Sequence, residues 1–379
     1  MATSAIGPGF LTQTAVFTTE LGASFAFVIL LSVLIDAIAQ LTIWRVIAAA
    51  RQPAQQIANR LQPGLGNTIA ILIFLGGLAF SIGNIAGAGL GLNALLGIDN
   101  VFGAVISTTI AIALFVFHEA KKAVDVFVNL LGILMIGLTL YVTWKSRPPL
   151  ADAAVRAIIP EKFSFMALLT IVGGTVGGYI TFAGAHRLLD AGVVGKQHLP
   201  SVTRSALSAI GIAAMMRILL FLAALGVVSQ GYFLDPENPP ASVFHWAVGE
   251  AGFRLFGLVM WSAAITSVIG SAYTSVSFIR TLHPRINQLQ QSIVIGFIFI
   301  ACVFYLIIGR PVKTLIVVGA LNGLILPLSL GVMLIAAYRP GVVADYKQPR
   351  WLTVSAIIVV VIMAWMGLRT LYQQFVTSP

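Results

Sequence analysis

The fold is decided by the stretch from Ile171 to His186, which reads IVGGTVGGYITFAGAH. Five glycines, together with threonine and tyrosine side chains, interrupt a segment that is otherwise apolar. Inside a bilayer every backbone N–H and C=O group needs a partner, and a glycine-rich run weakens the helix that would provide it. Such a run is tolerated where the freed groups face protein, water or a ligand. The stretch therefore predicts a broken transmembrane helix whose half-helix ends present free backbone groups to a solute.

Composition places the chain among polytopic membrane proteins. Of its 379 residues, 59% are hydrophobic and only 9% are charged, which leaves no polar shell for a soluble globule. The single cysteine, Cys302, excludes a disulfide framework and a cysteine metal cluster. No cleavable signal peptide is predicted, and the abrupt start leaves open whether the native N-terminus lies upstream of Met1.

Hydropathy predicts about eleven spans, with boundaries soft by several residues. The predicted fold class is therefore an all-α polytopic membrane protein. The spans lie near residues 5–22 (interrupted), 24–48, 66–96, 100–118, 123–143, 163–186 (interrupted), 203–229, 252–279, 290–308, 312–337 and 351–371.

The distribution of basic residues predicts the orientation in the membrane. With a cytoplasmic N-terminus, thirteen Lys and Arg residues lie in loops and helix ends on the cytoplasmic side, and eight lie on the opposite side. Because cytoplasmic loops carry the excess of basic residues, this orientation is favoured. Topology and contact with anionic lipid then explain the net charge of +10, and nucleic-acid binding is a poor second explanation. We expect a protein of the bacterial cytoplasmic membrane.

Two glycine-interrupted helices occupy corresponding positions in two halves of five spans each. The first reads GPGFLTQTAVFTTELG from Gly7 to Gly22, and the second is the stretch quoted above. This spacing predicts an inverted repeat with a binding site at the repeat interface. Residues 1–379 are thus predicted to form one transporter domain, with a first repeat over 1–143, a second over 163–337 and an additional helix over 351–371.

Three short motifs resemble the NRAMP family of proton-coupled divalent-metal transporters. GPGFL at 7–11 is similar to the family's opening G-P-x-F-L, and IVGGTV at 171–176 to the stretch that leads into its sixth-helix site. LNALLGI at 92–98 is similar to the end of the family's third helix. The resemblance covers most of the chain and implies the LeuT-type fold, with helices 1 and 6 broken.

The chain departs from the family at the metal site. The family binds metal with an Asp-Pro-Gly-Asn turn in the first helix and a Met-Pro-His turn in the sixth, where this sequence aligns by eye as Thr18–Leu21 and Gly177–Tyr179. The acidic pair of the family's third helix appears as Ser81 and Asn84. Mn²⁺ or Fe²⁺ needs carboxylate or imidazole ligands, and threonine hydroxyls with bare carbonyls do not replace them. We therefore predict no metal site and no cofactor.

A small organic solute suits the remaining groups better. Glycines let a solute approach the backbone, a half-helix N-terminus favours a carboxylate, and hydroxyls supply directional hydrogen bonds. The alternative is that the glycines only permit close packing of helices. The predicted substrate-binding residues are Thr18, Thr19, Gly174, Thr175, Gly177, Gly178 and Tyr179.

Three ionisable residues within the spans are candidates for ion coupling, since each costs roughly 2.5–3.5 kcal/mol at a helix centre. Glu20 follows the polar part of the first helix and is a candidate proton or cation ligand, or else a residue on the extracellular side. Asp36 is either a proton relay or the partner of a polar group on another helix, and Arg217 is the candidate partner. Arg217 is an anion site, a cation that discharges a proton carrier, or half of a buried ion pair.

Three polar residues follow the sixth-helix break. His186, Arg187 and Asp190 are candidates for a cytoplasmic gate, and an ordinary charged loop is the alternative.

The functional hypotheses follow from these residues. The sequence contains no His-Glu-x-x-His run, phosphate-binding loop or nucleophile elbow, so no enzyme activity is predicted. The first hypothesis is a secondary-active transporter of a small polar or carboxylate-bearing organic solute, coupled to protons through Glu20 or Asp36. The second is a divalent-cation transporter, for which Mg²⁺ is more plausible than Mn²⁺ because it keeps several waters and needs fewer carboxylates. The third is a substrate sensor that does not transport.

Overall fold

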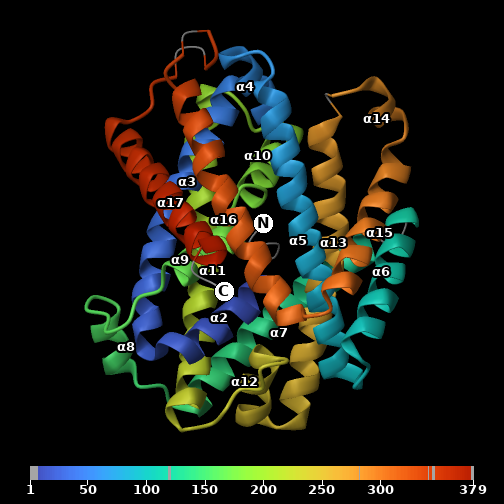
Figure 1. The fold of residues 1–379 in the computed structure, drawn as a ribbon, viewed down its shortest axis with the longest axis vertical. Helices are drawn as coiled ribbons and strands as arrows, with labels where there is room; N and C mark the ends of the chain where they lie inside the picture. The colour runs from blue at the N-terminus through green and yellow to red at the C-terminus, as the bar shows by residue number, and fades with distance from the viewer. Residues whose placement is uncertain (1–6, 118–120, 281, 340, 344–345, 377–379) are drawn as a thin grey trace.

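The computed structural model describes residues 7–117, 121–280, 282–339, 341–343 and 346–376. In these ranges the chain forms helices and no strands (Figure 1), which confirms the all-α prediction. The α-helices are α2 (Pro8–Leu21), α3 (Phe25–Ala50), α4 (Ala54–Leu61), α5 (Leu65–Leu96), α6 (Asn100–Val116), α7 (Lys121–Ser146), α8 (Leu150–Arg156), α9 (Phe165–Val176), α10 (Ile180–Asp190), α11 (Leu199–Ser229), α12 (Pro239–Val248), α13 (Glu250–Ile279), α14 (Pro284–Gln288), α15 (Gln290–Ile308), α16 (Pro311–Ala336) and α17 (Arg350–Val376), with short 3-10 turns η1 (Gly22–Ser24) and η3 (Lys196–His198).

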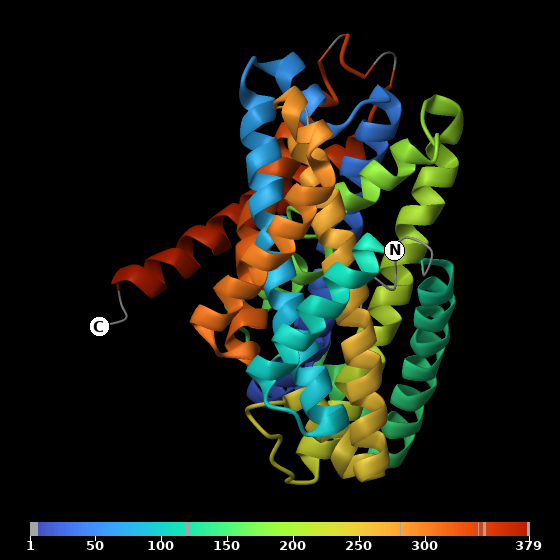
Figure 2. The ribbon, with the colours of Figure 1, turned by 90° about the vertical axis from the view of Figure 1, so that its right-hand side faces the viewer.

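The predicted spans all have counterparts in the structure. Eight segments are long and apolar enough to cross a membrane, and Asn100–Val116 and Leu130–Ser146 are shorter apolar helices. The first of the eight, Pro8–Ala50, contains both α2 and α3. The helices stand side by side, with α4 and α14 at one end of the bundle and α8 and α12 at the other (Figure 1). In Figure 2, α17 slants away from the bundle on its outside.

Glycine brings the C-terminal part of α5 into backbone contact with α13. A Cβ atom added at Gly91 would lie 2.6 Å from the Trp261 backbone nitrogen, and one added at Gly257 would lie 2.7 Å from the Leu95 nitrogen. No larger residue fits at these points without displacing backbone. Small residues at helix interfaces are the usual means by which membrane helices approach closely.

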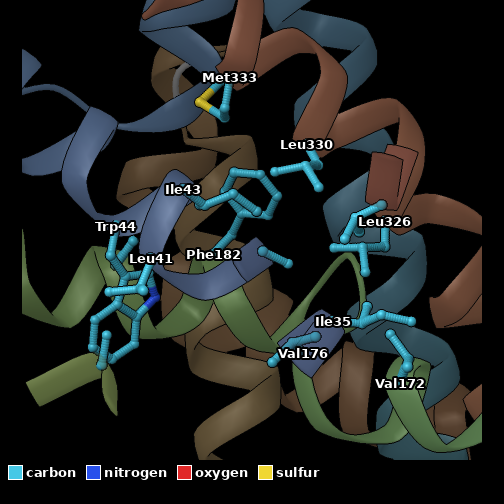
Figure 3. Packing of buried hydrophobic residues seen from close by; sticks show 14 of the residues in the cluster. Ile35, Leu41, Ile43, Trp44, Val172, Val176, Phe182, Leu326, Leu330 and Met333 are labelled. Atoms are coloured by element: carbon cyan, nitrogen blue, oxygen red, sulfur yellow. The ribbon is translucent and has the colours of Figure 1, made fainter. Parts of the chain in front are cut away.

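An apolar cluster fixes α10 against α3 and α16 (Figure 3). Phe182 lies among Ile43 of α3 and Leu330 and Met333 of α16, and all four side chains are buried. The Trp44 indole Nε1–H donates to the Thr181 carbonyl at 2.9 Å, next to the start of α10. The α10 half-helix is thus held by packing and by one side-chain hydrogen bond, while its first turn faces the interior.

The element order agrees with the predicted two halves. Helices α2, α3, α5, α6 and α7 come first, and α9–α10, α11, α13, α15 and α16 follow, with α17 as the additional helix. The division into repeats over 1–143 and 163–337 stays a prediction.

Candidate functional site

The sixth transmembrane segment is broken where the sequence predicts it. Helix α9 ends at Val176 and α10 begins at Ile180, so Gly177–Tyr179 are not helical. The Gly178 N–H donates to the Asn322 carbonyl of α16 at 3.0 Å. The Thr181 hydroxyl donates to the Val176 carbonyl at 2.5 Å. Two backbone groups at the break are therefore hydrogen-bonded, one to α16 and one to the first turn of α10, as buried backbone groups require.

Most glycines of the break serve close packing against α16. A Cβ atom at Gly173 would collide with the Gly319 carbonyl and with the backbone of Gly323, and one at Gly178 would collide with Ile325. At Gly177 it would lie 2.7 Å from the Asn322 Cβ. Gly173 and Gly177 are four residues apart, as are Gly319 and Gly323 of α16, a spacing common at close membrane-helix crossings. The packing alternative raised from the sequence thus accounts for these three glycines.

Gly174 faces a different neighbour. A Cβ atom there would lie 2.6 Å from the Gln13 Oε1 atom of α2, so the missing side chain makes room for a polar group. The next residue, Thr175, is buried and donates its hydroxyl to the Ile171 carbonyl at 2.8 Å. The last turn of α9 consequently has a polar neighbour, Gln13, on one side and the Thr175 hydroxyl on another.

A cavity adjoins the break on the side of Thr175 and Tyr179. It encloses about 720 Å³, including space continuous with solvent, and extends along α10 to Arg187. The Tyr179 hydroxyl donates to the Ser271 carbonyl of α13 at 3.3 Å, and its ring lies 5.6 Å from that of Phe80. The other residues that line the cavity come from α3, α10, α11 and α13: Gln40, Ile180, Ala183, Gly184, Ala209, Ile210, Ala213, Thr266, Ser267, Gly270 and Thr274. We call it the vestibule.

A second, smaller cavity lies on the other side of the same turn, between α2, α5, α9 and α16. It offers about 20 Å³ to the centres of water-sized molecules, and its lining contains no ionisable side chain. We call it the inner cavity. Its lining residues are Gly7, Gly9, Phe10, Gln13, Phe80, Gly83, Asn84, Gly173, Gly174, Leu315, Val318, Gly319 and Asn322.

Asp36 and Arg217 face each other in the interior. Arg217 Nη1 lies 4.0 Å from Asp36 Oδ2, and both side chains are 2% exposed. Arg217 Nη2 donates to the Thr175 hydroxyl at 2.7 Å, and Nη1 to the Ser32 hydroxyl at 3.4 Å. The guanidinium also lies over the Phe10 ring, 4.4 Å from its centroid. The structure therefore joins the two candidates as a buried ion pair that also holds the last turn of α9.

The expected irregular backbone at Thr18–Leu21 is not present, and the alignment of these residues with a metal-binding turn was wrong. Helix α2 is regular through Leu21. The Thr18 hydroxyl donates to the Thr14 carbonyl at 2.6 Å and that of Thr19 to the Ala15 carbonyl at 3.1 Å. Threonines that bond back in this way are satisfied within the helix. Thr19 and Glu20 are exposed, and the end of α2 that approaches the break is its N-terminal end, through Gln13.

The predicted gate residues do not form a single cluster. His186 Nε2 and Asp190 Oδ1 lie 3.9 Å apart, one turn from each other on α10. The His186 ring packs 5.3 Å from that of Phe278. Arg187 lines the vestibule, and Asp190 is exposed. Of the three, Arg187 is the residue that a solute in the vestibule would meet.

Sequence comparison decides the family. The family described as natural resistance-associated macrophage protein-like, or Nramp, matches residues 1–373. The chain belongs to the Nramp family. Among its relatives, the Bacillus subtilis membrane protein YcsG is 56% identical over 99% of this chain and 93% of its own length. A membrane protein of Haemophilus influenzae is 53% identical over 98% of this chain and 94% of its own.

Solved structures show that this Nramp chain has the LeuT-type fold. A manganese transporter of Eremococcus coleocola superposes with a TM-score of 0.76 at 16% identity, covering 100% of this chain and 86% of its own. MhsT in complex with L-phenylalanine superposes with a TM-score of 0.65 at 16% identity, covering 99% and 97%. The expectations of family and of fold drawn from the sequence are therefore confirmed.

Metal-binding side chains do not gather in the part of this Nramp chain that the structure describes. No group of three or more His, Cys, Asp or Glu side chains is positioned there to hold a metal ion. Glu20, the carboxylate considered for Mg²⁺, is exposed at the far end of α2 from the break.

Sequence reasoning missed two residues that line the inner cavity. Gln13 and Asn322 are each 1% exposed and belong to different halves of the chain. Asn84 was noted only as a replacement for an acidic residue. The available signal was an uncharged amide inside an apolar span, which is costly to bury unless it has partners. No spacing in the sequence connects the three, because they come together only in the folded bundle.

Proposed function

We propose that this Nramp-family protein is a secondary-active transporter that moves a small polar or carboxylate-bearing organic solute. The observation that carries the proposal is the chemistry around the α9–α10 break. The vestibule that reaches it is lined by hydroxyl, amide and apolar groups, and its charged lining residue is Arg187. Broken helices at the centre of a LeuT-type bundle are where secondary transporters bind their substrates.

A divalent metal ion is the less favoured cargo. Transition-metal ions require anionic or imidazole ligands, and neither cavity is lined by Asp, Glu, His or Cys. Mg²⁺ would need at least one carboxylate, and the candidate Glu20 lies away from both cavities. The fold itself leaves the cargo open, since it is shared by a manganese transporter and by a protein bound to L-phenylalanine. The residues of this chain therefore carry the argument.

The vestibule favours a solute with a carboxylate. Arg187 stands at the α10 end of the cavity, where a guanidinium can attract and orient a carboxylate. Thr175, Ser271 and Thr274 supply hydroxyl groups along the way to the break. A negatively charged or zwitterionic solute would thus enter past a positive charge and reach a polar, uncharged interior.

Orientation and coupling complete the proposal. Arg51 precedes α4 and Arg60 lies in its last turn, at the end of the bundle to which α10 extends (Figure 1), so we place that end in the cytoplasm. The vestibule then opens inward. Of the coupling candidates we retain Asp36, because it is buried beside Arg217, and a proton on this carboxyl would release the arginine that holds Thr175.

A thermal-stability panel on the detergent-purified protein tests the cargo. Mn²⁺, Mg²⁺ and Ca²⁺ are compared with small carboxylates, amino acids and lactams. A ligand at ~100 times its dissociation constant adds about 2.7 kcal/mol to the state that binds it. We expect saturable stabilisation by an organic solute and none by the metals. Stabilisation by Mn²⁺ or Mg²⁺ alone would overturn the proposal.

Flux measurements separate transport from sensing. The solute that stabilises the protein is offered to proteoliposomes with and without a proton gradient. We expect uptake that follows the gradient. Binding without uptake under any gradient would assign the protein to the class of sensors.

A further inference from the structure

The inner cavity is bordered by three carboxamide side chains whose orientation is fixed. Gln13 Nε2 donates to the Leu315 carbonyl at 3.0 Å, and Asn84 Nδ2 to the Phe80 carbonyl at 2.9 Å. Asn322 Nδ2 donates to the carbonyls of Gly76 and Val318, both at 3.2 Å. Each amide nitrogen thus donates to at least one backbone carbonyl, which directs its amide group. Gln13 Nε2 and Asn84 Nδ2 each keep a second N–H group.

Two of the amide oxygens lack a partner. Gln13 Oε1 and Asn322 Oδ1 are buried and accept no hydrogen bond from any residue that the structure describes. Leaving a buried acceptor unpaired costs about 1–3 kcal/mol, so each such atom calls for an explanation. Gly174 and Gly319 make room for the Gln13 side chain, since a Cβ at either position would press on its amide group. The chain keeps glycine at both positions and so keeps the amide in place.

The start of α2 adds groups of the opposite kind. Gly7 caps the helix without a side-chain hydrogen bond, and Gly7, Gly9 and Phe10 line the inner cavity. The first turn of a helix directs backbone N–H groups and the positive end of its dipole outwards, which favours an oxygen atom of a ligand. The inner cavity therefore offers hydrogen-bond acceptors from amide oxygens beside donors from a helix end. Its lining carries no formal charge.

We propose that the inner cavity binds the head group of the transported solute, and that this head group carries an N–H donor next to an oxygen acceptor without net charge. Gln13 Oε1 and Asn322 Oδ1 accept from the N–H groups, and the start of α2 donates to the oxygen. An α-amino acid head group and a neutral amide, such as a lactam, share this chemistry. The inference rests on the proposed function, because it names the class of solute for the same site.

Matched ligand pairs test the requirement for N–H. Thermal stability of the purified protein is titrated with 2-pyrrolidinone against γ-butyrolactone, and with L-alanine against L-lactate. The lactam pair keeps its shape and exchanges an N–H group for an ether oxygen. The alanine pair exchanges an ammonium group for a hydroxyl group and the zwitterion for a net charge of −1, so the lactam pair is the test of N–H alone. We expect the N–H member of at least one pair to bind at least tenfold more tightly. Preference within the lactam pair identifies a neutral amide, and preference within the alanine pair identifies an amino acid. Equal binding within both pairs would overturn the inference.

Two variants place the N–H preference in the inner cavity. Gln13→Met and Asn322→Leu keep side-chain volume close to native and remove the amide oxygen, so each should lose at least tenfold in affinity for the preferred probe. The control is Gln55→Met on α4, a buried glutamine outside the cavity whose Oε1 is also unpaired, and it should bind as the native protein does. If Gln13→Met does not fold, Gly174→Ala keeps the amide and presses on its oxygen instead. Unchanged affinity in the folded variants would contradict the assignment.

Failure of this inference is distinguishable from failure of the proposed function. Uptake of an organic solute without a preference for an N–H group would support the proposed transport function and contradict the head-group assignment. Uptake of Mn²⁺ or Mg²⁺ alone would contradict both proposals. Stabilisation by Na⁺ alone, without any probe, would assign the amide oxygens to an ion and overturn the head-group assignment.

Discussion

Two buried polar centres flank the last turn of α9, and they satisfy their polar groups differently. On one side Thr175 accepts a hydrogen bond from Arg217, whose charge is met by Asp36. On the other side Gly174 faces Gln13, whose amide oxygen has no partner among the described residues. Both centres keep buried atoms without a partner among the described residues, since Asp36 Oδ1 and Arg217 Nε are unpaired as well. They differ in charge and in access, because Gln13 lines a cavity and neither Asp36 nor Arg217 does. The uncharged centre is therefore the one we propose for a ligand, and the charged centre holds the α9 turn in position.

The largest expected effect comes from breaking the charged centre. Arg217→Met leaves Asp36 buried without a counter-charge, which costs about 3–5 kcal/mol when a buried pair loses one partner. The thermal midpoint in detergent should fall sharply. The double variant Asp36→Leu with Arg217→Met removes both charges and should recover most of the loss. A single variant as stable as the native protein would show that the pair does not hold the α9 turn.

The packing of α9 on α16 is the next test. Gly173→Ala places a methyl group against the Gly319 carbonyl and should destabilise the protein by about 1–3 kcal/mol, the usual cost of overpacking. The matched control is Gly296→Ala on α15, where no heavy atom lies within 4 Å of the added methyl. That control should be as stable as the native protein or slightly more so, because alanine favours helix over glycine. Equal thermal midpoints for the two variants would show that the crossing tolerates a side chain.

Tyr179→Phe has a smaller expected effect. It removes the hydroxyl that donates to the Ser271 carbonyl at 3.3 Å and leaves the ring against Phe80. The loss of stability should be about 0.5–1.5 kcal/mol, the net value of one hydrogen bond. Solute affinity, measured on the same sample, should fall less than in Gln13→Met. A larger loss of affinity in Tyr179→Phe would move the main binding contacts from the inner cavity to the vestibule.

Glu20→Gln should have the smallest effect. Glu20 is exposed at the end of α2 and lines neither cavity. Proton-driven uptake by this variant in proteoliposomes should stay within about twofold of native, as surface substitutions away from special features change little. Abolished coupling with intact solute binding would restore Glu20 as the coupling acid in place of Asp36.

The fold and one half of the site could be predicted from local sequence. The break at Gly177–Tyr179 is encoded where it occurs, because consecutive glycines weaken a helix whatever surrounds them. The binding role predicted for Thr18 and Thr19 requires free hydroxyl groups, which neither residue has. In an apolar setting a threonine satisfies its hydroxyl on the carbonyl one turn earlier, and both do so here.

The carboxamide half of the site was not predictable from spacing. Gln13, Asn84 and Asn322 are isolated polar residues on three helices, and none belongs to a motif. The glycines opposite them carry part of the information, yet a glycine that makes room for Gln13 and one that packs on α16 look alike in the sequence. The pairing of Asp36 with Arg217 could be predicted from the sequence, because an acidic and a basic side chain in apolar spans are less costly to bury as a pair than alone.

The Asp36–Arg217 pair also has a consequence for biosynthesis. Synthesis runs from the N-terminus, so α3 enters the membrane well before α11 exists. Until then Asp36 has no basic partner at its depth, and α3 is inserted by its apolar residues against a cost of about 2.5–3.5 kcal/mol for the acid. The pair between α3 and α11 can therefore form only once α11 has been synthesised, and we expect chains that end before α11 to insert α3 less efficiently than an Asp36→Leu variant of the same length.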